Sequence, residues 1–192
     1  GDARPPGVTL VEDASLVLLD ASPRAVASSA VTPSLAGSRW AVECRGDRDG
    51  TLPPLDLAAH RRLVELVWGL VATTVAGGDG PVAGIHDVSG GGLAVALAEM
   101  SVRSGIGCSV SGIEGHRELF FEGPSRVLVC TTRSAEVVAA AADAGVAFRV
   151  LGTTGGDRIA IDGLVDLPVA EARDAWRGRL PDLLDGLAPV TN

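Results

Sequence analysis

Hydrophobic positions recur along this chain with two different spacings, which together predict most of its helices and strands. From about residue 57 to 76, apolar side chains return every three or four residues and place Leu63, Leu66 and Leu70 on one helical face. Asp56, just before this segment, is a good N-cap for it. The helices predicted in this way cover about residues 57–76, 93–103, 134–144 and 169–180.

Short, almost unbroken apolar runs predict the strands. They cover about residues 14–20, 81–85, 106–111, 126–132, 148–152 and 158–161. The turn at 153–157 makes the last two a predicted hairpin. Because helices and strands alternate while the late strands are expected to pair locally, we expect an α+β fold, with a mixed or antiparallel sheet and helices packed on it.

Residues 1–36 differ in composition from the remainder of the chain. After the apolar run at 14–20, the stretch 21–35 is rich in Ser, Ala and Pro and has no helical periodicity. We therefore expect 1–36 to be the remnant of a preceding domain plus a linker, and 37–192 to be the domain itself.

Composition excludes several classes of protein. A hydrophobic content of 46% and a mean hydropathy of +0.30 suffice for a packed core. The net charge of −8 comes with no basic run that follows a phosphate backbone, so nucleic-acid binding is not expected. The sequence shows neither a signal-peptide pattern nor an apolar run long enough to span a membrane. Cys44, Cys108 and Cys130 lack metal-binding spacing and are expected to be small buried hydrophobic residues of a cytoplasmic protein.

The polar, glycine-rich stretch 84–92 is the first candidate site. Asp87 and Ser89 precede three consecutive glycines, Gly90, Gly91 and Gly92, and a strong helix-forming run follows at once. A turn of this kind lets a ligand approach the backbone, and the helix start offers N–H groups to an anion. In the functional interpretation, Asp87 contacts Mg²⁺ or a ligand hydroxyl, while Ser89 and the glycine amides bind phosphate. In the structural interpretation, the turn only needs glycine for steric reasons and Asp87 or Ser89 is an N-cap.

A second candidate stretch lies just before the predicted strand at 126–132. Glu122, Ser125 and Arg126 are placed to reach the same pocket from a neighbouring strand. The alternative is that Arg126 is a solvated strand end, and Phe120 and Phe121 are expected in the core in either case.

The histidines are weaker candidates, and a structural role is the better interpretation for each of them. His60 is predicted on the polar side of its helix, His116 in a loop, and His86 beside Asp87. A triad of Ser89, His86 and Asp87 is rejected, because residues so close in sequence rarely point at one another.

Taken together, the two stretches resemble a single family. The sequence His-Asp-Val-Ser-x-Gly-Gly-Leu-Ala at 86–94 resembles the C-terminal domain of the phosphoribosylformylglycinamidine synthase subunit (PurL) family, in the superfamily of aminoimidazole ribonucleotide synthetase (PurM). The stretch 119–126 matches the second signature of this family in order and distance. Gly37-Ser38-Arg39-Trp40 resembles the start of the domain, and the likeness extends over about residues 36–180.

The resemblance implies a layered fold like the C-terminal domain of PurM, and a reaction. ATP phosphorylates the formyl oxygen of formylglycinamide ribonucleotide, and ammonia from glutamine displaces the phosphate to give the amidine. It also implies Mg²⁺, with Asp87 as a possible ligand, and a nucleotide or phosphate site at Asp87, Ser89, the Gly90–Gly92 turn, Glu122, Ser125 and Arg126. The implied partners are the N-terminal domains of the same subunit, the glutaminase subunit PurQ and the small subunit PurS.

Two features separate this chain from the family pattern. The family usually has Asp at the position of Gly90, and Ser at the positions of Phe121 and Gly123. The resemblance also covers only the last quarter of a longer subunit, whose catalytic histidines and most ATP and Mg²⁺ ligands lie in earlier domains. We therefore expect no catalytic residue in this chain and no activity from it alone. The alternative is a non-catalytic domain that docks the rest of the synthase.

Overall fold

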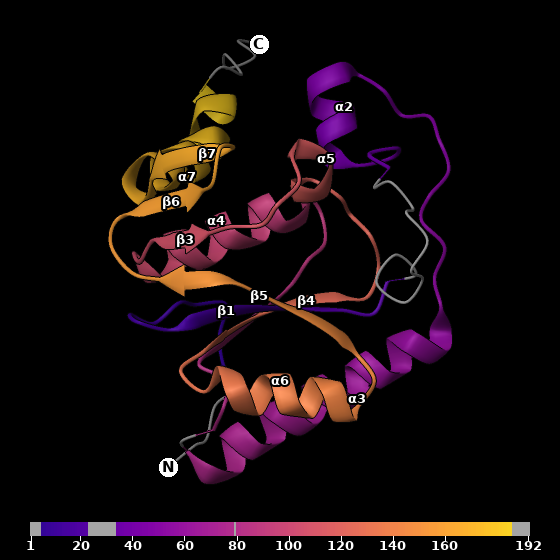
Figure 1. Ribbon diagram of the computed structural model, residues 1–192. Coiled ribbons are helices and arrows are strands. Elements are labelled where there is room, and N and C mark those ends of the chain that lie inside the picture. The colour runs from indigo at the N-terminus through magenta and orange to yellow at the C-terminus, as the bar shows by residue number, and fades with distance from the viewer. Residues whose placement is uncertain (1–4, 23–33, 79, 186–192) are drawn as a thin grey trace, which may run out of the picture.

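The computed structural model describes residues 5–22, 34–78 and 80–185. In this part of the chain, a mixed seven-stranded sheet separates two layers of helices, with α3 and α6 on one face and α4 on the other (Figure 1). The strand order is β2-β4-β1-β5-β3-β6-β7. The predicted α+β class, with helices packed on a mixed sheet, is confirmed.

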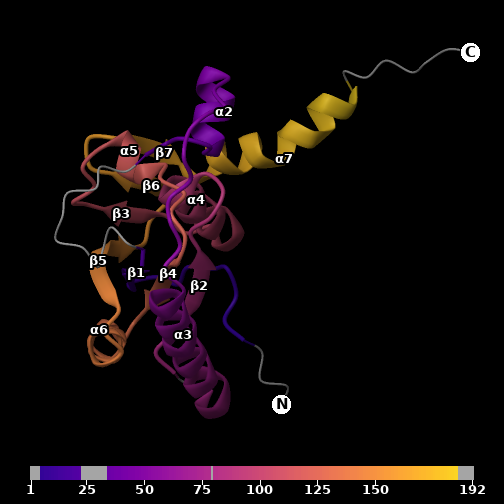
Figure 2. The same ribbon diagram turned by 90° about the vertical axis from the view of Figure 1, so that its right-hand side faces the viewer.

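The strands are β1 (Ser15–Asp20), β2 (Gly84–Asp87), β3 (Cys108–Val110), β4 (Arg126–Thr131), β5 (Ala147–Thr154), β6 (Arg158–Ile161) and β7 (Val165–Pro168). The helices are α2 (Arg39–Arg45), α3 (Leu57–Gly77), α4 (Gly92–Ser104), α5 (His116–Leu119), α6 (Ser134–Asp143) and α7 (Val169–Asp185). Helix α7 projects away from the layered body of the domain (Figure 2).

Side chains of the central strands alternate between two hydrophobic cores. On β1, Leu16 and Leu18 pack in the core beneath α4, whereas Val17 and Leu19 pack in the core beneath α3 and α6. All four are essentially inaccessible to solvent. A strand that is buried on both faces must be apolar at every position, which explains the unbroken hydrophobic run of β1.

Strand β1 lies in the middle of the sheet, although the composition of residues 1–36 predicts the remnant of a preceding domain there. It is antiparallel to β4 along one edge and to β5 along the other. Residues 15–20 therefore form part of the same sheet as the rest of the domain. The proposed boundary at residue 36 stays a prediction, and most of the expected linker, residues 23–33, lies outside the described residues.

The two long predicted helices at the centre of the chain match α3 and α4 closely. Asp56 caps α3, because its Oδ1 accepts hydrogen bonds of 2.9 and 3.0 Å from the N–H groups of Ala58 and Ala59. Gly105, in the left-handed conformation at φ 76°, ends α4. Local capping chemistry thus sets these boundaries.

The predicted hairpin between β5 and β6 is wrong. Strand β3 lies between them, antiparallel to β5 and parallel to β6. The pairing is decided by the core, because Cys108 and Val110 of β3 share the apolar cluster beneath α4 with Ile159 and Ile161 of β6. Strand β6 instead forms its hairpin with β7, a strand that the hydrophobic pattern did not predict.

Other departures from the predictions are local. The strand predicted at 81–85 is shifted to Gly84–Asp87, so that Asp87 is its last residue. The short helices α2 and α5 were not predicted, and His116 begins α5 instead of lying in a loop. Glu118 on α5 is only 2% exposed, although it is charged, and it forms an ion pair with Arg149.

The cysteines divide into two kinds. Cys108 and Cys130 are buried as expected, whereas Cys44 is exposed on α2, which corrects the expectation for that residue. All of them are free thiols. None of the helices in the described ranges is both long and apolar enough to cross a membrane.

Candidate functional site

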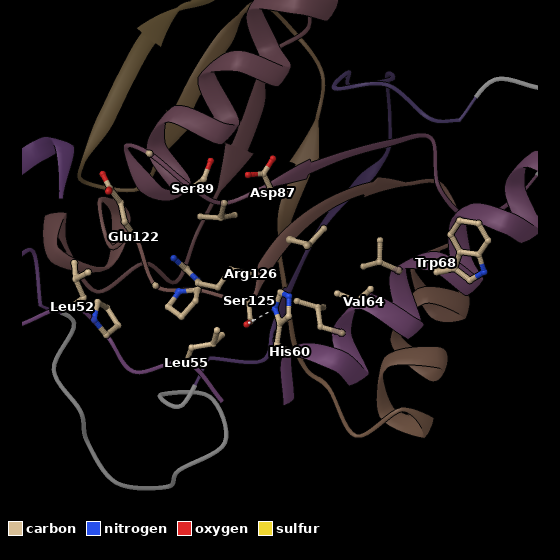
Figure 3. A pocket seen from close by; sticks show the side chains of 18 of the residues that line it. Leu52, Leu55, His60, Val64, Trp68, Asp87, Ser89, Glu122, Ser125 and Arg126 are labelled. Carbon is tan, nitrogen blue, oxygen red and sulfur yellow. Dashed lines mark hydrogen bonds between the residues drawn. The ribbon is translucent and has the colours of Figure 1, made fainter. Parts of the chain in front are cut away.

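An open groove with a volume of about 800 Å³ runs between α3 and the junction of β2 and β4 (Figure 3). It unites the two stretches that the sequence singled out. Among the predicted site residues, the groove is lined by Asp87, Ser89, Gly90, Glu122, Ser125 and Arg126. Gly91 and Gly92 belong to the same turn but do not line the groove.

The sheet brings these stretches together. Strands β2 and β4 are antiparallel, with Asp87 opposite Val127, and the Val88 N–H donates a hydrogen bond of 2.9 Å to the Arg126 carbonyl. The end of β2 therefore lies against the start of β4. Asp87 and Ser125 consequently reach one site, although nearly forty positions separate them in sequence.

The glycine turn owes its shape to two left-handed residues, Gly91 at φ 84° and Gly92 at φ 65°. A Cβ atom on Gly92 would lie 2.7 Å from the carbonyl carbon of Phe120, so the turn packs directly on the backbone after α5. Helix α4 has no side-chain N-cap hydrogen bond, which contradicts the interpretation of Asp87 or Ser89 as its cap. Glycine is required here by both conformation and close packing.

The carboxylate of Glu122 lies where the glycine turn could otherwise hold a bound anion. Glu122 Oε1 accepts a hydrogen bond of 2.7 Å from the Gly91 N–H, and Gly92 donates at 2.9 Å to the Ser89 carbonyl. The same Glu122 oxygen accepts a second bond of 2.7 Å from the Arg39 N–H at the start of α2. A carboxylate is favourable at helix N-termini, so Glu122 ties α2 to the turn before α4.

Asp87 presents its carboxylate to solvent at the rim of the groove, and its side chain is 72% exposed. The hydrogen bond from the Ser89 hydroxyl is the main cause that lowers the pKa of Asp87. Partial burial opposes this effect, and the nearby His86 lowers the pKa further, so that the net shift is downward. The carboxylate is therefore ionised at neutral pH. It is the most accessible negative charge among the predicted site residues.

His86 lies between two carboxylates. Its Nδ1 is 3.3 Å from Asp87 Oδ1, and its Nε2 is 3.0 Å from Glu99 Oε2 on α4. Asp87 thus contacts both His86 and Ser89, contrary to the expectation that such close residues point apart. Because Asp87 and not His86 is the central member of this set, the arrangement is not a Ser-His-Asp triad.

His60 belongs to the site, which the sequence interpretation missed. Its Nδ1 is 2.9 Å from the Ser125 hydroxyl, and both residues line the groove (Figure 3). Ser125 adopts the left-handed conformation at φ 64°, which costs a non-glycine residue about 1 kcal/mol. The signal for His60 was its position three and four residues before Leu63 and Val64, which places it on the groove-facing side of α3.

The Arg126 side chain is buried and bonded to other groups of the protein, so it is not accessible to a ligand. Its side chain is 1% exposed, its Nε is 3.2 Å from Asp20 Oδ2, and its Nη1 donates to the Phe121 carbonyl at 3.0 Å. The guanidinium carbon also lies 5.5 Å from the centre of the Phe121 ring. Arg126 therefore fixes the loop before β4, and its position in the groove wall is structural.

The remaining wall of the groove is apolar and unusually exposed. Leu52, Leu55, Val64 and Trp68 are 69%, 50%, 52% and 74% exposed, respectively. Trp68 and Val64 from α3 lie at the end of the groove opposite Leu52 and Glu122 (Figure 3). Such a patch is typical of a surface that meets a ligand or another protein.

The structure also locates the departures from the family pattern. Gly90 has no left-handed constraint, and the closest atom to an added Cβ would be Arg39 Cγ at 3.7 Å. By contrast, a Cβ on Gly123 would lie 2.2 Å from the Phe121 ring. Phe121 and Gly123 therefore depend on one another, whereas Gly90 has room for a side chain.

Within the described ranges, no group of three or more His, Cys, Asp or Glu side chains is arranged to hold a metal ion. A Mg²⁺ ion at Asp87 would receive one carboxylate from this site. The remaining oxygen ligands would come from water, a bound phosphate or another part of a larger protein.

Comparison with known proteins identifies the class to which this fold and site belong. Residues 37–162 match the model of the C-terminal domain of AIR synthase related proteins. This match covers more than half of the chain, so the chain belongs to that family.

Within this class, the similar proteins are PurL subunits of phosphoribosylformylglycinamidine synthase. The subunit from Nocardioides sp. is 40% identical over 153 residues, which are 78% of this chain and 19% of the relative. The subunit from Brucella ovis is 40% identical over 142 residues, which are 72% of this chain and 18% of the relative. The resemblance to the C-terminal domain of PurL is confirmed, and the chain spans about a fifth of the length of these curated relatives.

Solved structures show the same fold. PurL from Thermotoga maritima in complex with FGAR superposes with a TM-score of 0.67 over 90% of this chain and 30% of that one, at 17% identity. The PurLQS structure from the same organism gives a TM-score of 0.61 over 87% of this chain and 27% of that one, also at 17% identity. The layered PurM-like fold that the resemblance implied is therefore confirmed.

Proposed function

We propose that this chain is the C-terminal part of a PurL-type subunit, which converts formylglycinamide ribonucleotide to the amidine with ATP and glutamine-derived ammonia in the cytoplasm. The observation that carries the proposal is the 40% identity to PurL over 78% of the chain. The meeting of both sequence signatures in one groove supports it.

The chain works only as part of a larger assembly in this proposal. It spans 19% of the Nocardioides relative, and no catalytic residue is assigned to it. Its partners are the N-terminal domains of the same subunit, the glutaminase subunit PurQ and the small subunit PurS. The PurLQS structure of the Thermotoga maritima protein supports this choice of partners.

The groove is the part of this chain that faces the nucleotide in the proposal. Asp87, Ser89 and Gly90 are its accessible polar residues, and Ser125 is held by His60. PurL from Thermotoga maritima has been solved in complex with ATP, which supports a nucleotide as ligand of the whole enzyme. The chemistry that Mg²⁺ supplies when bound is charge neutralisation at phosphate oxygens, with Asp87 as a single protein ligand.

A second candidate is a non-catalytic domain that docks the preceding part of the same subunit. The exposed apolar wall formed by Leu52, Leu55, Val64 and Trp68 favours it, because such side chains are normally covered in an assembled protein. In this candidate, the polar residues of the groove only shape the turn.

A chimera tests the proposal. The region of Nocardioides PurL that matches this chain is replaced by this chain, and the purified chimera is assayed for ATP-dependent amidine formation with ammonia. We expect activity from the chimera and none from the isolated chain. A chimera that is folded by circular dichroism but inactive, beside an active parent, contradicts the proposal, and turnover by the isolated chain contradicts its dependence on the other domains.

An Asp87→Ala version of the chimera separates the two candidates. The nucleotide-facing groove predicts reduced amidine formation in a variant that stays folded by circular dichroism, because the substitution removes an exposed side chain. Unchanged activity would favour the docking domain. Asp166→Ala, on the similarly exposed β7, is the control.

A further inference from the structure

We propose that a small polar pocket between α2 and α5 binds a carboxylate group, with Arg45 and Arg117 as its cationic partners. The pocket has a volume of about 220 Å³ and shares no lining residue with the groove. Its chemistry comes from Trp40, Arg45 and Asp47 on and just after α2, and from His116 and Arg117 on α5. The inference is independent of the proposed function, because it concerns a different part of the surface.

The positive charge of this pocket has no carboxylate partner. Within the described ranges, neither Arg45 nor Arg117 forms an ion pair with an Asp or Glu side chain, although the chain carries a net charge of −8. Asp47 is the acidic residue that lines the pocket, and its Oδ1 accepts a hydrogen bond of 3.0 Å from the Asp49 N–H instead of pairing with either arginine. Two guanidinium groups that line one small cavity repel each other, and a bound anion relieves this repulsion.

The Arg45 side chain is already held in place for binding. Its guanidinium carbon lies 4.9 Å from the centre of the Trp40 ring. The Trp40 ring in turn lies 5.3 Å from the ring of His116 and 6.3 Å from that of Phe120, centre to centre. A guanidinium stacked on a ring keeps its N–H edge free for the two oxygens of a carboxylate. Less side-chain entropy is therefore lost when a ligand binds to Arg45.

The size and the charge of the pocket favour a small monoanion. Its 220 Å³ is below the range of about 300–1,000 Å³ that is typical of sites for drug-sized ligands, so a short-chain acid fits it. Asp47 repels a second negative charge, which favours a carboxylate over a phosphate dianion. The carboxylate comes either from a free small acid or from an acidic side chain of a partner polypeptide.

Propionate and propionamide form a matched pair of probes, because they have the same shape and differ in charge. Each is titrated at pH 8 and constant ionic strength into the ¹⁵N-labelled chain, and the indole N–H signal of Trp40 is followed by NMR, with those of Trp68 and Trp176 as internal references. We expect propionate to shift the Trp40 signal saturably and to bind about tenfold more tightly than propionamide, a difference of about 1.4 kcal/mol. Inorganic phosphate should bind more weakly than propionate.

Substitutions with matched controls test the assigned residues. Arg45→Gln and Arg117→Gln keep a hydrogen-bonding side chain without its charge, and each should weaken the binding of propionate about fivefold. Arg48→Gln, at an equally exposed position outside the pocket, should bind propionate as the wild-type chain does. Asp47→Asn should narrow the preference for propionate over phosphate. Dispersed spectra show that each variant is folded.

A capped aspartate, N-acetyl-aspartyl amide, distinguishes the two sources of the carboxylate. Tighter binding than that of propionate indicates a partner polypeptide, and weaker binding indicates a free acid; both results support the site.

Three results overturn the inference. The first is a Trp40 signal that propionate, at concentrations on the order of 100 mM, moves no more than propionamide does. The second is phosphate binding as tight as that of propionate. The third is an equal loss of binding in Arg48→Gln and Arg45→Gln, which would show a non-specific attraction of anions to surface arginines.

Discussion

The carboxylate of Glu122 lies 2.7 Å from the backbone nitrogen of Gly91, although 31 positions separate them in the chain. This bond connects the stretch 119–126, which contains Glu122, to the glycine turn at 84–92. The same carboxylate oxygen also accepts from Arg39, so one side chain joins α2, the loop before β4 and the turn before α4. The geometry of the groove therefore depends on a loop residue whose two hydrogen bonds both reach segments distant in sequence.

Replacing Glu122 tests this contribution to stability. Glu122→Ala removes two charge-assisted hydrogen bonds and should lower the free energy of unfolding by about 1–2 kcal/mol. Glu122→Gln keeps an acceptor and should cost less. Urea unfolding followed by circular dichroism measures both changes. Glu136→Ala, which loses only a surface contact of 3.7 Å to Arg133, is the control, and an equal loss in both alanine variants would contradict the prediction.

Gly92 and Gly90, two glycines of the same turn, should differ in how much an alanine substitution lowers the stability of the domain. Gly92→Ala places a Cβ at φ 65° and 2.7 Å from the Phe120 backbone, so it should destabilise the domain by more than about 2 kcal/mol. Gly90→Ala meets only Arg39 Cγ at 3.7 Å and should change stability by less than about 1 kcal/mol. Thermal unfolding of the pair provides the comparison. Similar melting temperatures would show that the turn relaxes more easily than the packing suggests.

The lowered pKa of Asp87 predicts a pH dependence of stability. Because its pKa is lower in the folded state, the stabilising contribution of Asp87 is fully present above its unfolded pKa, near about 4, and is lost as pH falls through the lower folded pKa. The stability advantage of the wild-type chain over Asp87→Asn should therefore shrink on acidification below about pH 4.

Ser89 supplies the largest part of this effect on Asp87. In Ser89→Ala, the pKa of Asp87 should rise towards its ordinary value, which an NMR titration of the carboxyl carbon detects. An unchanged titration in that variant would rule out the Ser89 hydroxyl as the main cause.

The domain contains a buried and an exposed Arg–Asp pair that should differ in importance. Arg126→Met leaves Asp20 and the Phe121 carbonyl without their partner in a nearly inaccessible site, and should cost about 3 kcal/mol. Arg158→Met breaks a pair whose side chains are 48% and 69% exposed, and should have a much smaller effect. Chemical denaturation measures the free energy of unfolding of both variants. Comparable decreases in the two variants would contradict the structural role assigned to Arg126.

The cysteines should react with a thiol reagent in two distinct phases. Burial raises the pKa of Cys108 to about 11 and also raises the pKa of Cys130, whereas Cys44 is exposed. At pH 8, one fast equivalent should react with DTNB and should disappear in Cys44→Ser. The other thiols should react only on unfolding, and a fast second equivalent in the folded chain would contradict their burial.

Much of the site was predictable because its residues are close together in sequence. The turn at 84–92 and the stretch 119–126 each carry a recognisable pattern, and the resemblance of both to one family placed them in a common pocket. His60 was missed because its only signal, a position three and four residues before Leu63 and Val64, is common to many polar residues on amphipathic helices. The commitment of Arg126 to Asp20 was likewise invisible, since the two partners are 106 positions apart.

Local chemistry along the chain determined the longer helices α3, α4, α6 and α7 and most strands of this protein, as well as its family. The cap of α3 at Asp56 and the end of α4 at Gly105 depend on side-chain and backbone preferences that act within a few residues. Tertiary structure alone decided that β1 lies at the centre of the sheet and that β3 separates β5 from β6. It also decided that Glu122 accepts a hydrogen bond from the Gly91 N–H of the glycine turn. Strand order and long-range hydrogen bonds follow from which apolar faces and polar groups satisfy one another in the assembled core, and that information is not held in any single segment.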